Sequence, residues 1–525
     1  MRALKKYMLV FFTLLFPAVS FADDLGLARI NLIDGDVQVM IQDTTDWTPA
    51  TINLPMNEGD RLWSPEASRA ELQIRGGVSA RIDADTALDI LTVTADSAQF
   101  YLDRGHVYIN NRRGGIRTSQ VDTPLVSIRS YDNSIMMIDI TEDGVTEISV
   151  LKGSAYAESR AGATQVVAGN TLTIRDANAD MAPLGAPDDW ERWNTDRDRL
   201  LTSWGESSRY LPDELHEYSS DFDANGHWDY AADYGYVWTP IVTEADWAPY
   251  SYGQWVWIRG NYVWISHHTW GWAPTHYGRW VTVASHGWCW VPPVRGAVYW
   301  GPGYVGWVVT PTYVAWVPLA PGEIYYGYGY YGPWSMNVMT INIQTVVINR
   351  PYVNARVRHG VNAAQRDSFG TGRRIPVQIR DNPFADGRGP GHAIIPPREK
   401  PPKPITFARP GAAEQSHIQP PPQRERVRQQ RTGPQVTTPS VVTRPREQRF
   451  PPDRVRNNRP QEMKNERRLV RERDASVFKQ QQPENLPVTR KREPKVIIRK
   501  PAIQQPGAQQ QKRPEGNRTE RRPER

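Results

Sequence analysis

The chain has 525 residues, a formal net charge of +6 and one cysteine, Cys289. A single cysteine excludes an intrachain disulfide, so the fold depends on an ordinary core and not on a disulfide framework. The charge is unevenly placed: residues 401–525 hold 30 Lys and Arg against 13 Asp and Glu, a net +17, which leaves −11 for the preceding 400 residues. This asymmetry predicts an acidic folded body followed by a basic tail.

The N-terminus has the pattern of a secretory signal peptide. Basic residues up to Lys6 precede the apolar run Met8–Phe16, and Ser20-Phe21-Ala22 places small residues where cleavage before Asp23 requires them. The apolar run is much shorter than the roughly 20 residues that span a membrane. We therefore expect residues 1–22 to be removed and the mature chain to be exported, to the periplasm or cell envelope, without a transmembrane span. An uncleaved N-terminal anchor is the alternative.

Residues 23–182 are expected to form an all-β domain. Apolar and polar residues alternate at Val37, Val39 and Ile41, and again at Ala70, Leu72 and Ile74, which is the period of a strand buried on one face. Several short strands in succession imply a sandwich, roll or barrel. Glycine tolerates the positive φ of tight turns, and hairpin turns are predicted at Asp34-Gly35, Arg104-Gly105, Asp143-Gly144, Lys152-Gly153 and Ala168-Gly169-Asn170.

Several motifs follow one another in this region: Ile33-Asp34-Gly35-Asp36-Val37-Gln38-Val39, Trp47, Met56-Asn57-Glu58-Gly59-Asp60-Arg61-Leu62, Leu102-Asp103-Arg104-Gly105-His106-Val107, Val121-Asp122-Thr123-Pro124 and Val150-Leu151-Lys152-Gly153-Ser154-Ala155. Together they resemble the FecR family of bacterial proteins, whose general role is to relay an outer-membrane signal across the inner membrane to a sigma factor. That role requires a cytoplasmic anti-sigma segment and a membrane helix ahead of the β domain. Because we expect the signal peptide to lead straight into the domain, the resemblance implies the fold and not the signalling.

Residues 187–217 are predicted to form a helical connector. Pro187 suits the first position of a helix, and the acidic residues after it favour the positive end of the helix dipole. Gly205 ends the helical pattern. The residues expected close to one helical face are Trp190, Trp193, Leu200, Leu201 and Trp204. Such a stripe is typical of a helix that packs on a neighbouring domain.

Residues 218–380 are expected to form a β-repeat domain with a Trp/Tyr core. Fifteen of the 20 tryptophans lie from Trp228 onward, and the segment 247–255 (WAPYSYGQW) recurs 25 positions later at 272–280 (WAPTHYGRW). A repeat of this length predicts a repeated supersecondary unit. Tryptophans two apart, such as Trp255 and Trp257 or Trp270 and Trp272, point to one face of an extended strand. This spacing favours core packing over an open surface.

Three further motifs lie in this region: Gly235-Tyr236-Val237-Trp238-Thr239-Pro240, Trp316-Val317-Pro318-Leu319-Ala320-Pro321-Gly322-Glu323 and Phe369-Gly370-Thr371-Gly372-Arg373. With the two Trp-Ala-Pro segments they resemble a Trp-rich domain of unknown function that follows FecR-like domains in exported bacterial proteins. The resemblance extends from His227 to about Arg374, and it implies no activity.

Residues 383–525 are predicted to be a disordered tail rich in Pro, Arg and Gln. Residues 401–525 contain 20 prolines and neither Trp nor Tyr, so they cannot bury enough apolar surface to offset chain entropy. Because export removes nucleic acid as a partner, the basic tail is expected to contact an anionic surface. That surface is a lipid headgroup layer, lipopolysaccharide, peptidoglycan carboxylates or the acidic body itself, and each contact is screened by salt.

Aromatic rings are the main candidates for ligand binding. Exposed Trp and Tyr faces stack on sugar rings, and Trp is the best cation–π partner. The candidate platforms for a glycan, peptidoglycan included, are Tyr252, Trp257, Trp264 and Tyr277, provided that they are exposed. The alternative is that most of the rings form the core.

No metal site is expected, although one segment begins like a calcium loop. Asp221, Asp223 and Asn225 supply oxygens at alternate positions, but Ala232 stands where the bidentate Glu is needed. The histidines near Cys289 fit no standard zinc spacing: they are His267, His268, His276 and His286. His276 replaces Ser251 of the first repeat and is expected at the surface, and Cys289, between two tryptophans, is expected to be a packed side chain. We expect no cofactor.

These observations predict a non-catalytic envelope scaffold or binding protein, whose body contacts a glycan or a partner protein. One alternative is a FecR-type regulatory or sensing component that acts through a partner. The other is a glycan-hydrolysing enzyme, which would need two of the carboxylates at 188–246 to face each other across a cleft at about 5–9.5 Å. Acidic loops between β units account for those carboxylates equally well.

Overall fold

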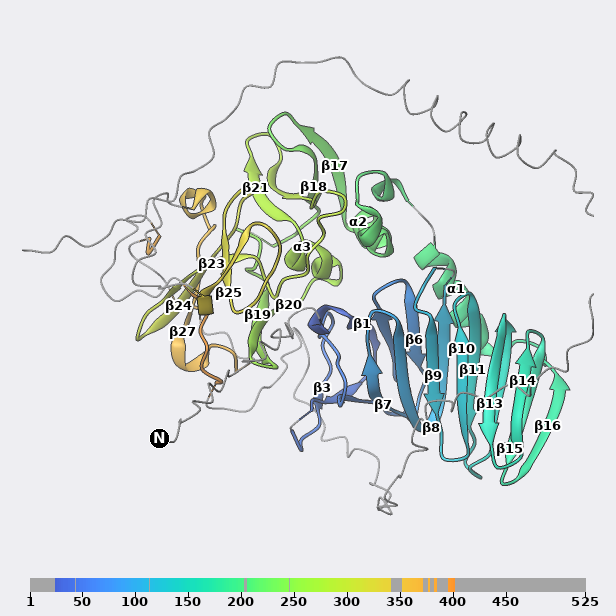
Figure 1. The fold of residues 1–525 in the computed structure, drawn as a ribbon. Coiled ribbons are helices and arrows are strands. Elements are labelled where there is room, and N and C mark those ends of the chain that lie inside the picture. Colours follow the sequence, from blue (N-terminus) through green and yellow to red (C-terminus); the bar gives the residue numbers. More distant parts are fainter. Residues whose placement is uncertain are drawn as a thin grey trace, which may run out of the picture. The chain divides into compact units, whose positions relative to one another are not determined.

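In the computed structural model of the protein, residues 24–401 are described except for 43, 113, 203–204, 245, 341–351, 372–375, 378–381 and 385–394. The predicted signal peptide and nearly all of the predicted tail lie outside the described residues. As far as residues 24–401 are described, no helix combines the length and the apolar character that a membrane span requires. The fold is mainly β, with one longer helix between two β regions (Figure 1), as the sequence predicts.

The first β region contains sixteen strands joined in one hydrogen-bonded network. They are β1 (Ala28–Asp34), β2 (Gln38–Met40), β3 (Thr48–Pro49), β4 (Arg61–Ser64), β5 (Arg69–Ile74), β6 (Val78–Ile82), β7 (Thr86–Val93), β8 (Ser97–Asn111), β9 (Thr118–Asp122), β10 (Val126–Tyr131), β11 (Ser134–Ile140), β12 (Thr146–Lys152), β13 (Ser154–Ser159), β14 (Gly162–Val167), β15 (Asn170–Arg175) and β16 (Asn178–Pro183). The central order is β14-β13-β10-β9-β8-β11-β12-β15-β16.

The long strand β8 connects two faces of this region. Its first part pairs with β7 and β9, and its second part pairs with β6 and β11. The change of partners occurs at Gly105, where φ is +84° and an added Cβ would lie 2.4 Å from the Thr86 hydroxyl. The prediction of a hairpin turn at Arg104-Gly105 is therefore wrong: the glycine allows a strand to change partners. The glycines of the other predicted turns do have positive φ, at Gly35, Gly144, Gly153 and Gly169. Only Asp143-Gly144 is a hairpin turn, between β11 and β12, because the other three connect strands that pair with different partners.

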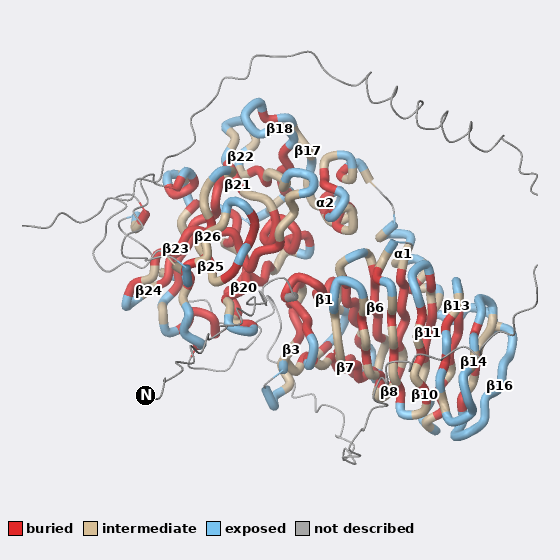
Figure 2. The backbone as a smooth tube through the Cα atoms, in the orientation of Figure 1, coloured by how far each residue is buried: buried red, intermediate tan, exposed pale blue. Residues whose placement is uncertain are grey.

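The core of this region is aliphatic and follows the predicted alternation. Val37 and Val39 are fully buried, as are Ala70, Leu72 and Ile74. Figure 2 shows buried segments running along the inner strands, whereas the edge strand β16 is exposed. Area burial of this kind is the main favourable term in folding.

Helix α1 (Asp189–Thr202) lies within the predicted connector. Trp190 is buried and its ring stacks on Trp193 with centroids 5.2 Å apart, which confirms the N-terminal part of the predicted aromatic stripe. Leu200 is 62% exposed, so the C-terminal part of that stripe is wrong there. Short elements follow: η2 (Glu206–Arg209), η3 (Asp213–Tyr218) and α2 (Ser219–Asn225).

The second β region is built from short hairpins. Its elements are β17 (Gly226–Ala231), β18 (Gly235–Pro240), β19 (Gly253–Ile258), β20 (Asn261–Ser266), η4 (Thr269–Gly271), α3 (Trp272–His276), β21 (Arg279–Val283), β22 (Gly287–Val291), β23 (Val305–Val309), β24 (Tyr313–Pro318), β25 (Tyr325–Gly327), β26 (Ser335–Asn337), η5 (Val338–Thr340), η7 (Val353–Arg356), β27 (Asn362–Gln365) and η8 (Arg366–Ser368).

Four of these hairpins carry a tryptophan opposite a tryptophan. The pairs are Trp228 and Trp238, Trp255 and Trp264, Trp280 and Trp290, and Trp307 and Trp316. Seven of these eight rings are buried, and Trp228 is half-buried. Aromatic pairs across a strand stabilise a sheet beyond the area that they bury.

Glycines make room for these rings. A Cβ added at Gly226 would lie 2.3 Å from the Trp238 ring, and one added at Gly278 would lie 2.7 Å from the Trp290 ring. Gly253 meets the Trp264 ring in the same way, at 2.5 Å. The glycine two residues before a strand tryptophan therefore lets the ring of the opposite strand cover the backbone.

The two Trp-Ala-Pro segments differ in conformation. The second forms η4 and α3, whereas the first lies in an irregular stretch before β19. The prediction that Trp270 and Trp272 share one face of an extended strand is therefore wrong, because both lie in short helical turns. Trp255 and Trp257 do lie on one strand, β19, where Trp255 is buried and Trp257 is half-buried.

Candidate functional site

Two of the four predicted aromatic platforms are buried. Trp264 and Tyr277 are each 1% exposed, because both rings face the inside of the aromatic domain, and this corrects their assignment as platforms. Tyr252 and Trp257 are half-buried. Tyr252 makes an edge contact with the His267 ring at 5.2 Å. Only these two of the predicted rings can offer a face to a ligand.

The predicted calcium-loop residues lie in helix α2 and already have protein partners. Asp221 forms an ion pair of 2.9 Å with Arg29, and Asp223 accepts a hydrogen bond from the Ser207 backbone N–H. Asn225 donates to the Asp221 carbonyl. A helix cannot wrap these oxygens around one ion as a loop does. In the part of the chain that is described, no group of three His, Cys, Asp or Glu side chains could hold a metal ion.

His276 is fully buried, so its prediction as a surface residue is wrong. The ring stacks on Trp300 with centroids 5.1 Å apart, and its Nδ1 lies 2.7 Å from the Gly301 carbonyl oxygen. Burial lowers the pKa of His276 to about 3, which keeps the ring neutral. Cys289 is also buried, as expected of a packed side chain, and burial raises the pKa of its thiol.

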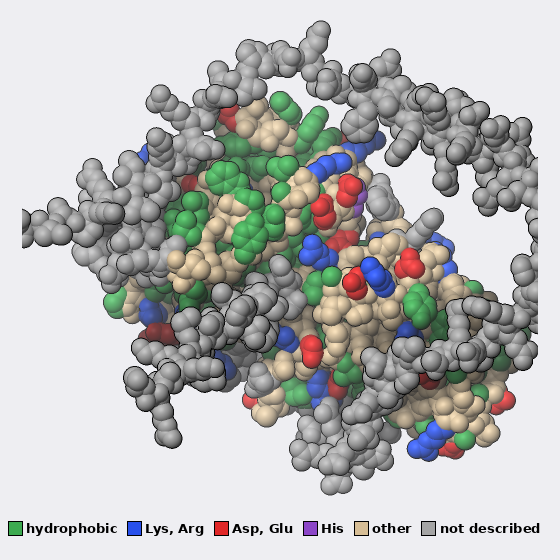
Figure 3. Space-filling model, in the orientation of Figure 1, with side chains coloured by type: hydrophobic (Ala, Val, Ile, Leu, Met, Phe, Trp, Pro, Cys, Tyr) green, Lys and Arg blue, Asp and Glu red, His purple; other side chains and the backbone are tan. Residues whose placement is uncertain are grey.

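A partly exposed row of rings that sequence reasoning missed lies on the β17–β18 hairpin and at the end of η2. Trp228, Tyr210, Tyr236 and Tyr230 follow one another with ring centroids 5.0, 4.6 and 5.5 Å apart. Tyr230 is 67% exposed and Tyr236 is 51% exposed. We call these four residues the tyrosine ladder. Figure 3 shows apolar side chains, a class that includes tyrosine, gathered over the surface where Figure 1 places this hairpin.

The rings of the ladder are inclined to one another. Tyr236 is tilted by 41° to Tyr210 and by 76° to Tyr230. Trp228 continues the row inward, because its ring lies 5.9 Å from that of the buried Phe222. The ladder is thus anchored in the core at one end and open to solvent at the other, which is the arrangement of a preformed binding surface.

The electrostatic surroundings of the ladder are acidic. The sequence from Tyr210 to Ile258 contains nine Asp and Glu residues and no Lys or Arg. Glu206 accepts a hydrogen bond from the Tyr210 hydroxyl at 3.2 Å, and Asp233 is exposed in the hairpin turn. Such a surface favours a ligand that combines apolar groups with positive charge.

Two tyrosines elsewhere in this domain bind a segment rich in Pro and charged residues, 395–401. Tyr328 donates a hydrogen bond of 2.9 Å to the Pro396 carbonyl, and the Arg398 guanidinium lies over the Tyr328 ring at 5.2 Å. Tyr262 donates to the Glu399 carbonyl at 2.8 Å. Hydroxyl-to-carbonyl bonds and ring-to-guanidinium contacts therefore hold this segment on the domain.

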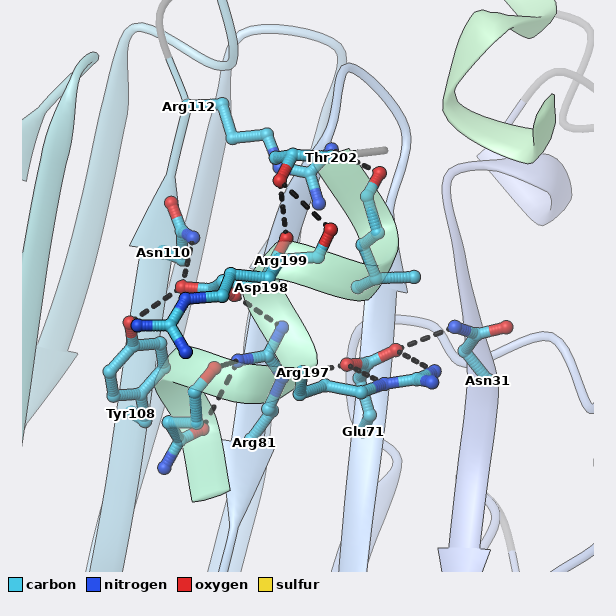
Figure 4. A network of polar contacts seen from close by, with 12 residues as sticks. Asn31, Glu71, Arg81, Tyr108, Asn110, Arg112, Arg197, Asp198, Arg199 and Thr202 are labelled. Carbon is cyan, nitrogen blue, oxygen red and sulfur yellow. Dashed lines mark hydrogen bonds and ion pairs between the residues drawn. The ribbon is translucent and has the colours of Figure 1, made fainter. Parts of the chain in front are cut away.

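A buried charge network joins helix α1 to the first β region (Figure 4). Arg81 on β6 and Glu71 on β5 have fully buried side chains and form an ion pair of 2.6 Å. Two residues of α1 complete it: Asp198 pairs with Arg81 at 2.6 Å, and Arg197 pairs with Glu71 at 3.0 Å. Burial alone would raise the pKa of Glu71, but the two guanidinium groups lower it to about 2.

The remaining hydrogen-bonding positions of this network are satisfied as well. The Tyr108 hydroxyl and the Asn110 amide each donate to Asp198 at 2.7 Å. Arg81 also donates to the Asn194 side chain and carbonyl. A buried ion pair is stable only when its other groups are bonded in this way, since desolvation of the charges is costly.

A second contact fastens the connector to the same β region. The Glu217 carboxylate accepts hydrogen bonds from the backbone N–H groups of Gly76 and Gly77, at 3.0 and 2.9 Å. Arg29 on β1 pairs with Asp221 of α2. The connector is thus held by polar contacts at α1, η3 and α2.

Comparisons with known proteins agree with this division of the chain. The FecR protein family model matches residues 60–156, and the model of a family of unknown function, DUF6600, matches residues 219–323. Two crystal structures of a protein described as a "putative anti-sigma factor" from Parabacteroides distasonis ATCC 8503 match at 12% identity with a TM-score of 0.21, and the match covers 24% of this chain and 59% of that chain. No protein with a curated description matches. The chain therefore contains a FecR domain followed by a separate DUF6600 domain.

Proposed function

We propose that the protein is a non-catalytic sensing component of the cell envelope that acts through a partner protein. The observation that supports this role is the match of the FecR family to the β region that holds the connector through buried ion pairs. The general role of FecR proteins is to relay a signal, and in this proposal the relay passes through a partner protein. A relay requires that a change in one domain reach the next, and the ion pair between Arg29 of β1 and Asp221 of α2 is a contact through which it could pass.

In this proposal the DUF6600 domain supplies the binding surface. Its tyrosine ladder and the half-buried Tyr252 and Trp257 are aromatic groups with accessible faces. Aromatic anchors beside polar groups are the usual composition of a recognition surface. The partner protein would then bind the FecR domain differently according to whether the binding surface of the DUF6600 domain holds a ligand.

The same exposed rings support a second candidate, an envelope scaffold that contacts a glycan such as peptidoglycan. In that case the aromatic faces would stack on sugar rings, and no partner protein would be needed. The two candidates differ in what remains bound to the protein after isolation.

A crosslinking experiment in cells separates them. The full chain carries an affinity tag, is crosslinked in the envelope and is purified under denaturing conditions. Recovery of a membrane-embedded or sigma-factor-binding partner supports sensing. The partner should be lost with Asp198→Asn, which weakens the ion pair between α1 and Arg81. Asp96→Asn, at an exposed ion pair, is the matched control and should leave the recovery unchanged. Retention on peptidoglycan without such a partner would overturn it in favour of the scaffold. Release of soluble glycan fragments by the purified protein would overturn the non-catalytic assignment.

A further inference from the structure

We propose that the tyrosine ladder is a docking site for a segment of this same chain, Pro420–Arg426. The segment reads Pro-Pro-Pro-Gln-Arg-Glu-Arg. It lies beyond the described residues, and the proposal concerns where it binds. This inference rests on the proposed function in one respect, that the ladder is a binding surface, and its test reads the occupant of the ladder separately from the partner of the FecR domain.

The first argument is that the domain already binds a segment of the same chemistry. Pro396, Arg398 and Glu399 are held by Tyr328 and Tyr262 through carbonyl hydrogen bonds and a guanidinium-over-ring contact. The tyrosine ladder offers the same groups, phenol hydroxyls and open ring faces, without a described partner segment across them.

The second argument is the shape of the ladder. Neighbouring rings are in contact and inclined by 41° and 76°, so they form an uneven aromatic surface, whereas a flat platform would need coplanar rings. Proline-rich segments in the extended polyproline conformation dock on aromatic-lined surfaces, and they lose little entropy on binding. This geometry favours a proline-rich peptide over a sugar, for which stacking on a flat face is the usual mode.

The third argument is charge. The stretch from Tyr210 to Ile258 holds nine acidic residues and no Lys or Arg, and two of the nine, Asp213 and Asp221, pair with arginines from elsewhere in the chain. The carboxylates of Glu206 and Asp233 are exposed. Arg424 and Arg426 follow the three prolines of the segment. Guanidinium groups suit both the carboxylates and the tyrosine faces.

Chain length allows the contact. Nineteen residue steps separate Pro401, the last described residue, from Pro420, and an extended chain of that length reaches roughly 60 Å. The segment can therefore bind the domain from which it follows, without a second copy.

A photocrosslinking experiment on the full chain tests the proposal. Benzoylphenylalanine replaces Tyr234, which is 39% exposed in the hairpin turn and is not one of the four ladder residues. The same probe replaces Tyr156, a 40% exposed tyrosine of β13, as the matched control. After irradiation, tryptic peptides are mapped by mass spectrometry. The expected result is a crosslink from position 234, and not from position 156, to residues within 402–427.

Three further measurements make the result specific. The crosslink yield should fall several-fold in the double variant Tyr230→Ala and Tyr236→Ala. It should also fall several-fold in the double variant Arg424→Glu and Arg426→Glu. The matched charge change, Arg444→Glu with Arg446→Glu, should leave the yield unchanged. Raising the salt from about 0.05 to about 0.5 M should lower it, because exposed charges are screened. Absence of the crosslink, equal yields from positions 234 and 156, or crosslinks that form only between two chains would each overturn the proposal. Crosslinking to a glycan or to another protein in place of the segment would overturn it as well.

Discussion

The two β regions of this protein reach stability with different side chains. The FecR domain has an aliphatic core of Val, Ile and Leu on alternating strand positions, and it places charged groups inside, at Glu71 and Arg81. The DUF6600 domain keeps most of its tryptophans in cross-strand pairs, with glycines beneath the rings. The first arrangement depends on completed ion pairs, and the second depends on close ring packing. Perturbations of charge and of volume should therefore affect the two domains differently.

The largest expected effect comes from Arg81→Met. The change leaves Glu71 with only one guanidinium partner, Arg197, and removes the ion-pair partner of Asp198. Breaking one side of a buried ion pair costs about 3–5 kcal/mol of folding stability. Urea unfolding followed by circular dichroism measures the loss. Arg117→Met, at an ion pair whose side chains are 83% and 72% exposed, is the control and should change nothing measurable. A loss below about 1 kcal/mol for Arg81→Met would show that the network is not essential to the FecR domain.

Acidification should move the two domains in opposite directions. The pKa of the buried His276 is about 3 in the folded protein against 6.5 when exposed, so this group makes the DUF6600 domain lose stability as the pH falls from 6.5 toward 3. Burial raises the pKa of Glu323 in the same domain, and that carboxyl acts in the opposite sense. Burial raises the pKa of Asp60 in the FecR domain to about 6 against 3.8, so that domain gains stability as the pH falls from 6 toward 4.

Proteolysis in graded urea at pH 6.5 and pH 4.5, resolved by peptide mass spectrometry, reads the two domains separately. His276→Gln should flatten the pH response of the DUF6600 domain, whereas His227→Gln, at a half-exposed ring, should not. A parallel shift of both domains would contradict the assignment of these two groups.

A smaller loss is expected from Gly278→Ala, where the added Cβ would lie 2.4 Å from the Val291 carbonyl and 2.7 Å from the Trp290 ring. We expect a destabilisation of about 2–3 kcal/mol, from the close contact and the positive φ together. Gly260→Ala is the matched control, because its φ is also positive but nothing lies within 4 Å of the added Cβ. It should cost only about 1 kcal/mol. Equal losses at the two positions would mean that ring packing contributes nothing at Gly278.

The smallest effect on stability is expected from Tyr236→Ala, since the ring is 51% exposed. Surface changes of this kind usually stay within about 0.5 kcal/mol. Thermal unfolding checks this, with Trp238→Ala as the contrasting change two positions along the same strand, where the ring is fully buried. If Tyr236→Ala destabilised the domain as much as Trp238→Ala, the ladder would be part of the core and not a binding surface.

Much of the fold could be predicted from the sequence, because local patterns determined it. Alternation at Leu72 and its neighbours identified a strand, and Pro187 with its acidic followers identified helix α1. The two-residue spacing of Trp270 and Trp272 predicts an extended strand, but the same spacing also occurs in the short helical turns η4 and α3. The pair Arg104-Gly105 predicts a turn, but a positive φ at glycine also allows a strand to change partners.

The candidate site was less predictable, since exposure is a tertiary property. Tyr277 is the same residue type as Tyr230 and Tyr236, and only the packing of the hairpins separates the buried ring from the exposed ones. One local feature could have identified the ladder: the order Trp228, Tyr230, Tyr236, Trp238 is symmetric about the hairpin turn. The network of Glu71 and Arg81 joins residues ten apart to a helix more than a hundred residues later, a separation that no local pattern reveals.

The network at Arg81 also constrains the order in which the protein is assembled. The strands that carry Glu71 and Arg81 precede α1 by more than a hundred residues, so during synthesis the β region is complete in sequence before Asn194, Arg197 and Asp198 exist. Until they arrive, a cation and a carboxylate face each other with several hydrogen-bonding positions unfilled, which is costly in a core. The FecR domain is therefore expected to mature late, when its C-terminal helix docks, and a chain truncated before α1 should remain open to proteases even though every strand is present.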